Sequence, residues 1–285
     1  MSLSTLSSND SPNGSHQQSS NISASSFKPL AGKVALITGS GRGIGKGMAL
    51  ELASRGASLI INYAKSADAA QGVVAEIKKM SVSAIALQAD VSKPEQIFKM
   101  FDDAVAHFGK LDIVISNSGT EVWNKEEEVM PADFDYIFNI NCRGQFFVAQ
   151  QGLKHLSRGG RIILMSSIAA QMAGVANHAL YAGSKAAVEG FTRSFAVDCG
   201  HKGITVNAIA PGGVKTDMFD ANAWHYAPNG SPDMPMEKIE AGLASMCPLG
   251  RCGTPADIAK AVYLLVSPES EWINGQVIRL SGGGI

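Results

Sequence analysis

Net charge is almost absent from this chain of 285 residues, since 24 lysines and arginines stand against 25 aspartates and glutamates and leave a formal charge of -1. So balanced a field does not attract polyanions, and we expect no nucleic-acid partner. Hydrophobic residues make up 45% of the sequence and charged residues 17%. The chain can therefore bury a sizeable core and fold as a globular protein.

Cysteine is also scarce. The four cysteines, Cys142, Cys199, Cys247 and Cys252, form no CxxC pair and have no histidine at zinc-finger spacing. This pattern indicates neither a disulfide framework nor a metal site. We expect reduced thiols that pack as small hydrophobic groups, no metal, and a cytoplasmic protein.

Long apolar runs are missing, because none reaches the roughly 20 residues that a membrane span requires. We expect no membrane association. The first 29 residues are rich in serine and asparagine and lack both the apolar core of a secretory signal and the arginines of a transit peptide. Such a composition predicts a disordered tail over residues 1–29, followed by a single domain over residues 30–285.

Short aliphatic runs alternate with longer segments of helical spacing from Ala31 onward. Strands are expected at Val34–Thr38, Ser58–Asn62, Ser83–Gln88, Ile113–Ser116, Arg161–Ser166, Thr205–Ala210 and Val277–Leu280. Helices are expected at Gly43–Ser54, Ala67–Lys79, Pro94–His107, Asp133–Leu156, Leu180–His201 and Pro255–Leu265. Strands that are apolar throughout belong to parallel sheets covered on both faces. The pattern predicts a doubly wound α/β Rossmann fold with a seven-stranded parallel sheet, with ligands at the carboxyl ends of the strands.

A long segment, residues 212–248, interrupts this alternation. It is rich in aromatic residues and methionine: Met218, Phe219, Trp224, Tyr226, Met234, Met236 and Met246. Loops of this length are usually functional or disordered. We interpret the segment as a substrate-binding lid over a flat apolar ligand; the alternative is a set of surface helices packed on the core.

A glycine-rich turn follows the first expected strand and opens a helix. It reads Thr38-Gly39-Ser40-Gly41-Arg42-Gly43-Ile44-Gly45. Glycines let the backbone approach a pyrophosphate at a helix N-terminus, where free amides and the helix dipole favour anions. The spacing TGxxxGxG resembles that of the short-chain dehydrogenases/reductases. Taken alone, the turn is equally consistent with a flexible loop.

Charge at the end of the second strand bears on cofactor choice. Sites that prefer NAD usually carry an acid there, about 20 residues beyond the glycines. This chain has Asn62-Tyr63-Ala64-Lys65-Ser66 instead. Arg42, Tyr63, Lys65 and Ser66 can donate hydrogen bonds to a 2′-phosphate, which favours NADP(H). The alternative is that Arg42 and Lys65 are ordinary surface cations.

Two further segments follow strands of the expected sheet. Asp90-Val91 ends the third strand, where a carboxylate can accept from an adenine amino group, and Ser116-Asn117-Ser118-Gly119 ends the fourth. The latter resembles the NNAG of the family, with Asn117 and Gly119 kept. Without the resemblance, either segment reads as a turn.

The sequence Tyr181-Ala182-Gly183-Ser184-Lys185 provides the main catalytic candidates. Residues four apart share a helix face, so the Tyr181 phenol and the Lys185 ammonium can meet over one ligand. Lowering a tyrosine pKa from about 10 to neutrality takes roughly 4 kcal/mol, and Lys185 with an oxidised nicotinamide can supply it. A tyrosine at this spacing can also be merely structural.

Two upstream residues complete the proposed catalytic set. Ser167 lies fourteen residues before Tyr181 and would hydrogen-bond the carbonyl oxygen that Tyr181 protonates. Ser166 is the alternative for this role. Asn141 would bind a water that links Lys185 to solvent, and Lys185 would also hold the nicotinamide ribose.

Several stretches resemble the fungal hydroxynaphthalene reductases and the related anthraquinone and versicolorin reductases within the family. They are residues 140–147, 211–218 and 226–230. The resemblance implies NADPH-dependent reduction of a polyhydroxylated aromatic polyketide in a homotetramer. It places Pro211, Gly212, Val214 and Thr216 at the cofactor, and Met218, Tyr226, Met246 and the carboxyl-terminal Ile285 at the substrate. Met246 replaces a tryptophan of the naphthalene reductases, which leaves the substrate's size open.

Two other functions fit the same motifs. A 17β-hydroxysteroid or other secondary-alcohol dehydrogenase would use the same catalytic groups in the oxidative direction. A non-catalytic dinucleotide-sensing regulator could share the fold, although such proteins typically lose the tyrosine or the lysine, and this chain keeps both.

Overall fold

A computed structural model describes residues 28–173 and 175–284. The expected disordered tail lies outside the described residues except for Lys28 and Pro29. Seven parallel strands form one sheet in the order β3-β2-β1-β4-β5-β6-β7. The strands are β1 (Val34–Ile37), β2 (Ser58–Tyr63), β3 (Ala84–Gln88), β4 (Leu111–Ser116), β5 (Leu156–Met165), β6 (Thr205–Pro211) and β7 (Val277–Leu280). This arrangement confirms the predicted single-domain Rossmann fold.

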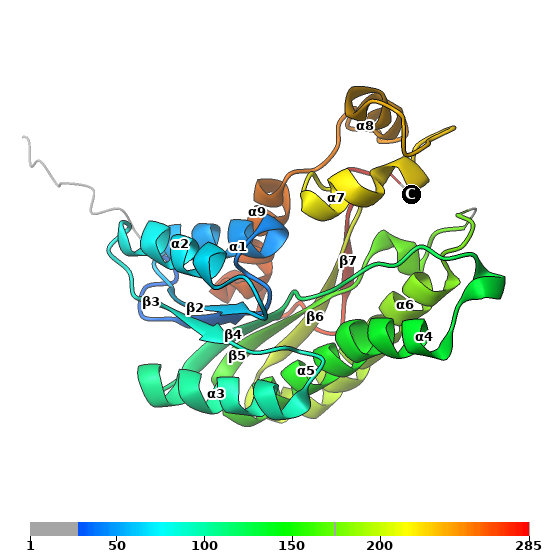
Figure 1. The fold of residues 1–285 in the computed structure, drawn as a ribbon. Coiled ribbons are helices and arrows are strands. Elements are labelled where there is room, and N and C mark those ends of the chain that lie inside the picture. Colours follow the sequence, from blue (N-terminus) through cyan, green and yellow to red (C-terminus); the bar gives the residue numbers. More distant parts are fainter. Residues whose placement is uncertain (1–27, 174, 285) are drawn as a thin grey trace, which may run out of the picture.

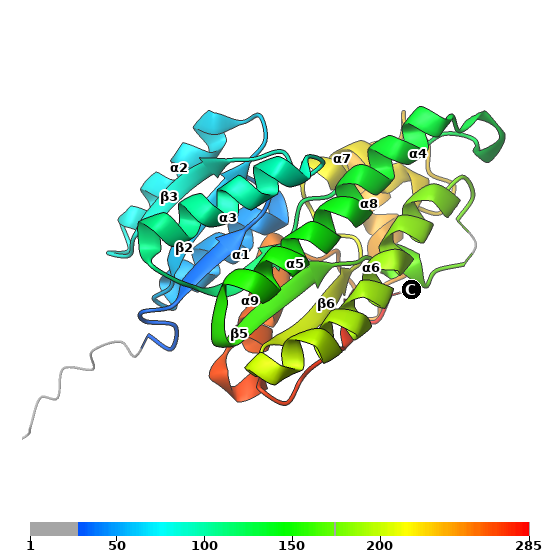
Figure 2. The same cartoon turned by 90° about the horizontal axis from the view of Figure 1, so that it is seen from below.

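Helices cover both faces of the sheet (Figure 1). One face carries α1 (Gly43–Ser54), α2 (Ala67–Lys78) and α9 (Pro255–Val266). The other carries α3 (Pro94–Phe108), α5 (Gln145–His155) and α6 (Ala179–Cys199), which lie in front in Figure 2. No helix within residues 28–173 and 175–284 is long and apolar enough to cross a bilayer.

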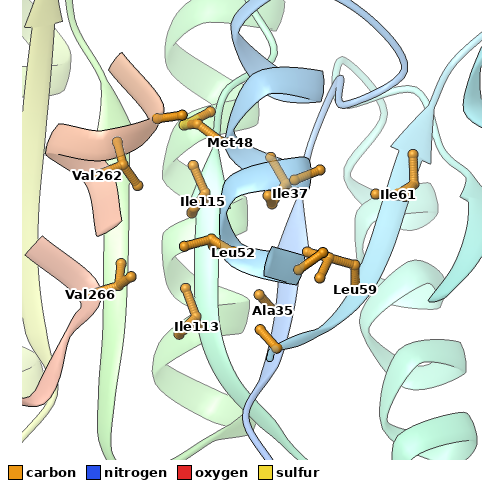
Figure 3. Close-up of a cluster of buried hydrophobic side chains, with 14 of the residues drawn as sticks. Ala35, Ile37, Met48, Leu52, Leu59, Ile61, Ile113, Ile115, Val262 and Val266 are labelled. Atoms are coloured by element: carbon orange, nitrogen blue, oxygen red, sulfur yellow. The ribbon is translucent and has the colours of Figure 1, made fainter. Parts of the chain in front are cut away.

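Aliphatic side chains join the sheet to its helices. Figure 3 shows Ile37 and Ile115 of the central strands packed against Met48 and Leu52 of α1, with Val262 of α9 beside them. Each of these five side chains is fully buried, and burying such a side chain stabilises a fold by about 1.5–3 kcal/mol. This packing holds the start of α1, where the glycine turn lies, against the central strands.

The helix expected over Asp133–Leu156 is divided. The structure has α4 (Pro131–Phe138), a π-helical turn at Asn139–Gly144, and then α5, while Leu156 already belongs to β5. The Asn141 side chain is anchored to a neighbouring loop and to α6. A Cβ at Gly144 would lie 2.9 Å from the Val91 carbonyl oxygen, so the backbone there approaches another segment closely. Such π turns are frequent at functional sites.

Segment 212–248 has three short helical elements. It contains α7 (Asp217–Asn222), a 3-10 turn (Ala223–His225) and α8 (Met236–Ser245). These elements share a small apolar cluster centred on Phe219, Ala223, Ala227, Ile239 and Cys252. Figure 1 shows α7 and α8 on one side of the sheet, apart from its covering helices. The segment's function as a lid stays a prediction.

Candidate active site

A cavity of about 1160 Å³ lies at the carboxyl ends of the strands and reaches under α7. Residues that follow β1 and β4 line it, at the point where the strand order reverses. The predicted residues that line the cavity are Gly39, Arg42, Gly43, Ile44, Gly45, Asn62, Tyr63, Lys65, Ser66, Asp90, Val91, Asn117, Gly119, Ser167, Tyr181, Lys185, Pro211, Gly212, Val214, Thr216, Met218, Tyr226 and Met246. Ile285 lies outside the described residues.

Two asparagines hold the glycine turn in shape. Asn62 accepts a hydrogen bond from the Gly39 amide at 3.0 Å, and Asn117 donates to the Thr38 carbonyl at 2.9 Å. A Cβ at Gly45 would lie 2.5 Å from the Gly39 carbonyl oxygen, so only glycine lets α1 begin this close to the strand end. The turn and the first residues of α1 line the cavity, which is the arrangement that binds a pyrophosphate.

Hydrogen-bond donors gather at one end of this cavity. Tyr63 ends β2, and Lys65 and Ser66 follow it, where the sequence has no acidic residue. The guanidinium of Arg42 lies near the Asp217 carboxylate, and both side chains are largely exposed. A 2′-phosphate at this end would therefore meet cations and hydroxyl groups.

Tyr181 and Lys185 of α6 face the same cavity, as their spacing predicts. The Lys185 Nζ atom lies 5.6 Å from the centre of the Tyr181 ring and donates a hydrogen bond to the Met165 carbonyl oxygen at 3.0 Å. Burial lowers the pKa of Lys185 to about 8. Near pH 8 the Lys185 amine is therefore only partly protonated.

The pKa of Tyr181 departs from the expectation of an acidified phenol. Burial raises it above its usual value, the negative charge of Glu121 raises it further, and a hydrogen bond with Ser167 lowers it. Lys185 does not lower it, because loss of water around the phenolate costs more than a neighbouring amine returns. In this structure Tyr181 holds its proton at neutral pH, the form that donates to a carbonyl oxygen.

The two candidate serines have different surroundings. Ser166 is buried, and its Oγ atom lies 3.3 Å from the Lys185 carbonyl oxygen and 3.2 Å from Glu189 Oε1. Both serines line the cavity, but only the Ser167 side chain lies close enough to Tyr181 to lower the pKa of the phenol. This geometry favours Ser167 for the bond to a substrate oxygen.

Asn141 lies fully buried at the π-helical turn, behind the cavity. Its Oδ1 atom accepts from the Thr120 amide at 2.9 Å, and its Nδ2 atom donates to the Thr120 carbonyl at 2.9 Å and to Ser184 Oγ at 3.1 Å. These bonds use both Nδ2 hydrogens and one lone pair of Oδ1. A water at Asn141 would bind the second Oδ1 lone pair or the main chain, and the proton-resupply role stays a prediction.

Sequence reasoning missed Glu121 at the cavity wall, and two residues that pack around its partner Tyr226. Glu121 accepts a hydrogen bond from the Tyr226 hydroxyl, and His178 Nε2 lies 3.1 Å from the same hydroxyl. Trp123 stacks on the His178 ring. A carboxylate five residues beyond β4 was the available signal, because ligands meet the carboxyl ends of strands. In the described part of the chain, no three histidine, cysteine, aspartate or glutamate residues group as a metal site would require.

Comparison with known proteins identifies the class. Residues 39–284 match the family described as "Enoyl-(Acyl carrier protein) reductase". With the Rossmann sheet, the glycine turn and the Tyr181–Lys185 pair, this match shows that the chain belongs to the short-chain dehydrogenase/reductase family, whose members are oxidoreductases.

Close relatives are reductases of one kind. The chain is 65% identical over 276 residues to "Tetrahydroxynaphthalene reductase PfmaG" of Pestalotiopsis fici, covering 96% of this chain and 100% of that protein. It is 55% identical over 255 residues to a hydroxynaphthalene reductase of Aspergillus fumigatus, covering 90% of this chain and 93% of that protein. A short-chain dehydrogenase from Burkholderia cenocepacia, solved in complex with NADP, is 36% identical to this chain with a TM-score of 0.81. The match covers 90% of this chain and 98% of that one.

Proposed function

We propose that this protein is an NADPH-dependent ketone reductase that acts on a polyhydroxylated aromatic polyketide, of the hydroxynaphthalene or hydroxyanthraquinone type, in fungal secondary metabolism. The observation that carries the proposal is one continuous cavity, which joins the glycine turn to Tyr181 and then to the apolar and aromatic side chains of Met218, Tyr226 and Met246. The 65% identity to a tetrahydroxynaphthalene reductase supports the substrate class.

The residues at the cavity fit NADP(H). The amides of the glycine turn would hold the pyrophosphate, and Asp90 with Val91 would meet the adenine. Arg42, Tyr63, Lys65 and Ser66 would hold the 2′-phosphate. When bound, the reduced nicotinamide supplies the hydride for a carbonyl carbon. NADP in the Burkholderia cenocepacia relative supports this choice.

The chain's own residues manage the proton. Tyr181 donates its hydroxyl proton to the carbonyl oxygen as negative charge develops there, and Ser167 hydrogen-bonds the same oxygen. Lys185 would hold the nicotinamide ribose, and Asn141 the water that returns a proton. Thr216, with Pro211, Gly212 and Val214, would border the nicotinamide.

The far part of the cavity would hold the substrate rings. Tyr226 supplies an aromatic face for stacking on a planar phenol. Met218 and Met246 are 42% and 46% exposed, so both have apolar surface to cover with a ligand. Ile285 would close the edge of this site.

We also propose a homotetramer that works in the cytoplasm. Large apolar side chains are exposed on two separate parts of the surface. One part has Phe134, Phe146 and Val197 on α4, α5 and α6, and the other has Leu264 at the end of α9 and Trp272 between α9 and β7. Two self-complementary faces on one subunit generate a closed tetramer. Trp272→Asp should halve the mass measured by light scattering, and an unchanged mass would argue against this face.

The function is tested by a substrate panel scored by NADPH absorbance. Hydroxynaphthalenones, hydroxyanthraquinones and steroid ketones are compared, and we expect turnover with the aromatic substrates. Tyr181→Phe should lower kcat by roughly 10²–10⁴-fold while NADPH still binds. Preference for steroids would favour the steroid dehydrogenase alternative, and NADPH binding without any turnover would favour a regulator.

A further inference from the structure

Glu121 lies at the cavity wall, and no motif assigns it a role. It follows β4 by five residues and accepts a hydrogen bond from the hydroxyl of Tyr226, which lies in the segment between α7 and α8. His178, at the start of α6, lies 3.1 Å from the same Tyr226 oxygen through its Nε2 atom. Three separate parts of the chain therefore meet at one phenol.

The protons in this group can be assigned. Burial raises the pKa of Tyr226, so its hydroxyl keeps the proton that it donates to Glu121. Burial also lowers the pKa of His178 to about 4, so that ring is neutral at neutral pH. With the phenol proton committed to the carboxylate, the Nε2–H of His178 is the donor to the Tyr226 oxygen. The Tyr226 hydroxyl thus donates one hydrogen bond to Glu121 and accepts another from His178.

Packing restricts the rings around this phenol. Trp123 lies between two histidines, with ring centres 4.5 Å from His178 and 3.8 Å from His225, in nearly parallel planes. The Tyr226 ring meets Trp123 and His178 edge-on, at 5.2 Å and 5.3 Å. Stacked and edge-to-face pairs of this kind each stabilise by roughly 0.5–1.5 kcal/mol. The orientation of the Tyr226 ring is therefore fixed before a substrate arrives.

Glu121 lines the same cavity as Tyr181 and Lys185, so its charge also acts on the proton donor. It raises the pKa of Tyr181 and counteracts the lowering of the Lys185 pKa by burial. In return, Lys185 and the Tyr226 hydroxyl oppose the rise that burial causes in the pKa of Glu121. The other titratable groups here are His178, His225 and Cys142. Burial lowers the pKa of both histidines and raises the pKa of the cysteine, so it favours the neutral form of all three.

We propose that Glu121 is a positioning residue of this active site, which holds the Tyr226 ring at the cavity wall and places a negative charge beside Tyr181 and Lys185. The role rests on the reductase function proposed above. Tyr226 is then oriented to stack on a substrate ring, and Tyr181 is kept in the protonated form that reduction consumes.

Two variants separate the two effects. Glu121→Gln keeps the shape and an acceptor for Tyr226 but removes the charge, whereas Tyr226→Phe removes the hydrogen bond and keeps the charge. Glu127→Gln is the matched control, because Glu127 is an exposed carboxylate in the same segment. The measurement is the pH profile of kcat and KM for ketone reduction, with thermal unfolding to show that each variant folds.

In Glu121→Gln we expect the alkaline limb of kcat to move to lower pH by about one pH unit, because Tyr181 loses its proton more easily. In Tyr226→Phe we expect KM to rise roughly threefold to tenfold while the limb stays in place. Glu127→Gln should change neither. An unmoved limb in folded Glu121→Gln, or an unchanged KM in Tyr226→Phe, overturns the proposal.

A second readout does not need turnover. The ionisation midpoint of Tyr181 is followed by tyrosinate absorbance, as the difference between a chain with Tyr181 and its Tyr181→Phe counterpart. We expect a lower midpoint in Glu121→Gln than in the unmodified protein, and equal midpoints would sink the charge effect. If no ketone is reduced but the midpoint moves, the proposed function fails while the role of Glu121 stands.

Discussion

The guanidinium of Arg42 lies 3.1 Å from the carboxylate of Asp217, so the glycine turn is bonded across the cavity to the first turn of α7. The two side chains are 73% and 69% exposed. An ion pair so open to water contributes about 0–1 kcal/mol to stability. Its significance is instead that Arg42 already has an anionic partner where a 2′-phosphate would bind.

Arg42→Ala should therefore weaken the binding of NADPH more than the binding of NADH. We expect the KM for NADPH to rise about tenfold and the KM for NADH to change little, since only NADPH carries the 2′-phosphate. Asp217→Asn should lower the KM for NADPH, because it removes the competing carboxylate. Initial rates with both cofactors measure this, and equal losses for NADPH and NADH in Arg42→Ala would contradict the assignment.

Two glycines should respond in opposite directions to alanine. At Gly45 a Cβ would lie 2.5 Å from the Gly39 carbonyl oxygen and 2.7 Å from Asn117 Nδ2, so Gly45→Ala should destabilise the fold by roughly 1–3 kcal/mol and weaken NADPH binding. At Gly72, inside α2, no atom lies within 4 Å of the new Cβ. Gly72→Ala should stabilise by roughly 0.5–1 kcal/mol. Urea unfolding measures both, and a neutral Gly45→Ala would refute the close approach.

Asn141→Ala should destabilise the π-helical turn. It leaves the partly buried amide and carbonyl of Thr120 without their partner, at a cost of about 2 kcal/mol. Thr120→Ala is the control, because the main-chain groups that bond Asn141 remain, and we expect a change within about 0.5 kcal/mol. Similar free energies of unfolding for the two variants would show that the Asn141 bonds do not hold the turn.

Lys185 should make stability depend on pH in alkaline solution. Burial lowers its pKa from 10.5 to about 8 on folding. Between these two values the unfolded chain binds more protons than the folded protein, so the stability of the protein rises with pH. Below a pH of about 8, burial of the protonated Lys185 lowers the stability by the full amount of roughly 3 kcal/mol. Lys185→Met should thus be more stable than the unmodified protein at pH near 7, with the difference shrinking toward pH near 10. A difference independent of pH would contradict the buried, protonated lysine.

The sequence alone predicted the sheet and many of the residues that line the cavity. Parallel strands place their carboxyl ends at one edge, so residues such as Asn117 and Ser167 could be assigned to the cavity from their position after a strand. Helix periodicity likewise placed Tyr181 and Lys185 on one face. These predictions depended on local spacing, which a sequence displays directly.

Only the tertiary structure decided how the site is charged and where the long helix divides. Glu121 and Tyr226 are 105 positions apart and meet only after folding, and the turn at Asn141 depends on contacts with Thr120 and Ser184. The pKa of Tyr181 rises instead of falling because burial and the carboxylate of Glu121, which is far from Tyr181 in the sequence but near it in the fold, both raise it. Desolvation and long-range charge depend on which groups surround a side chain in space, and periodicity does not encode that.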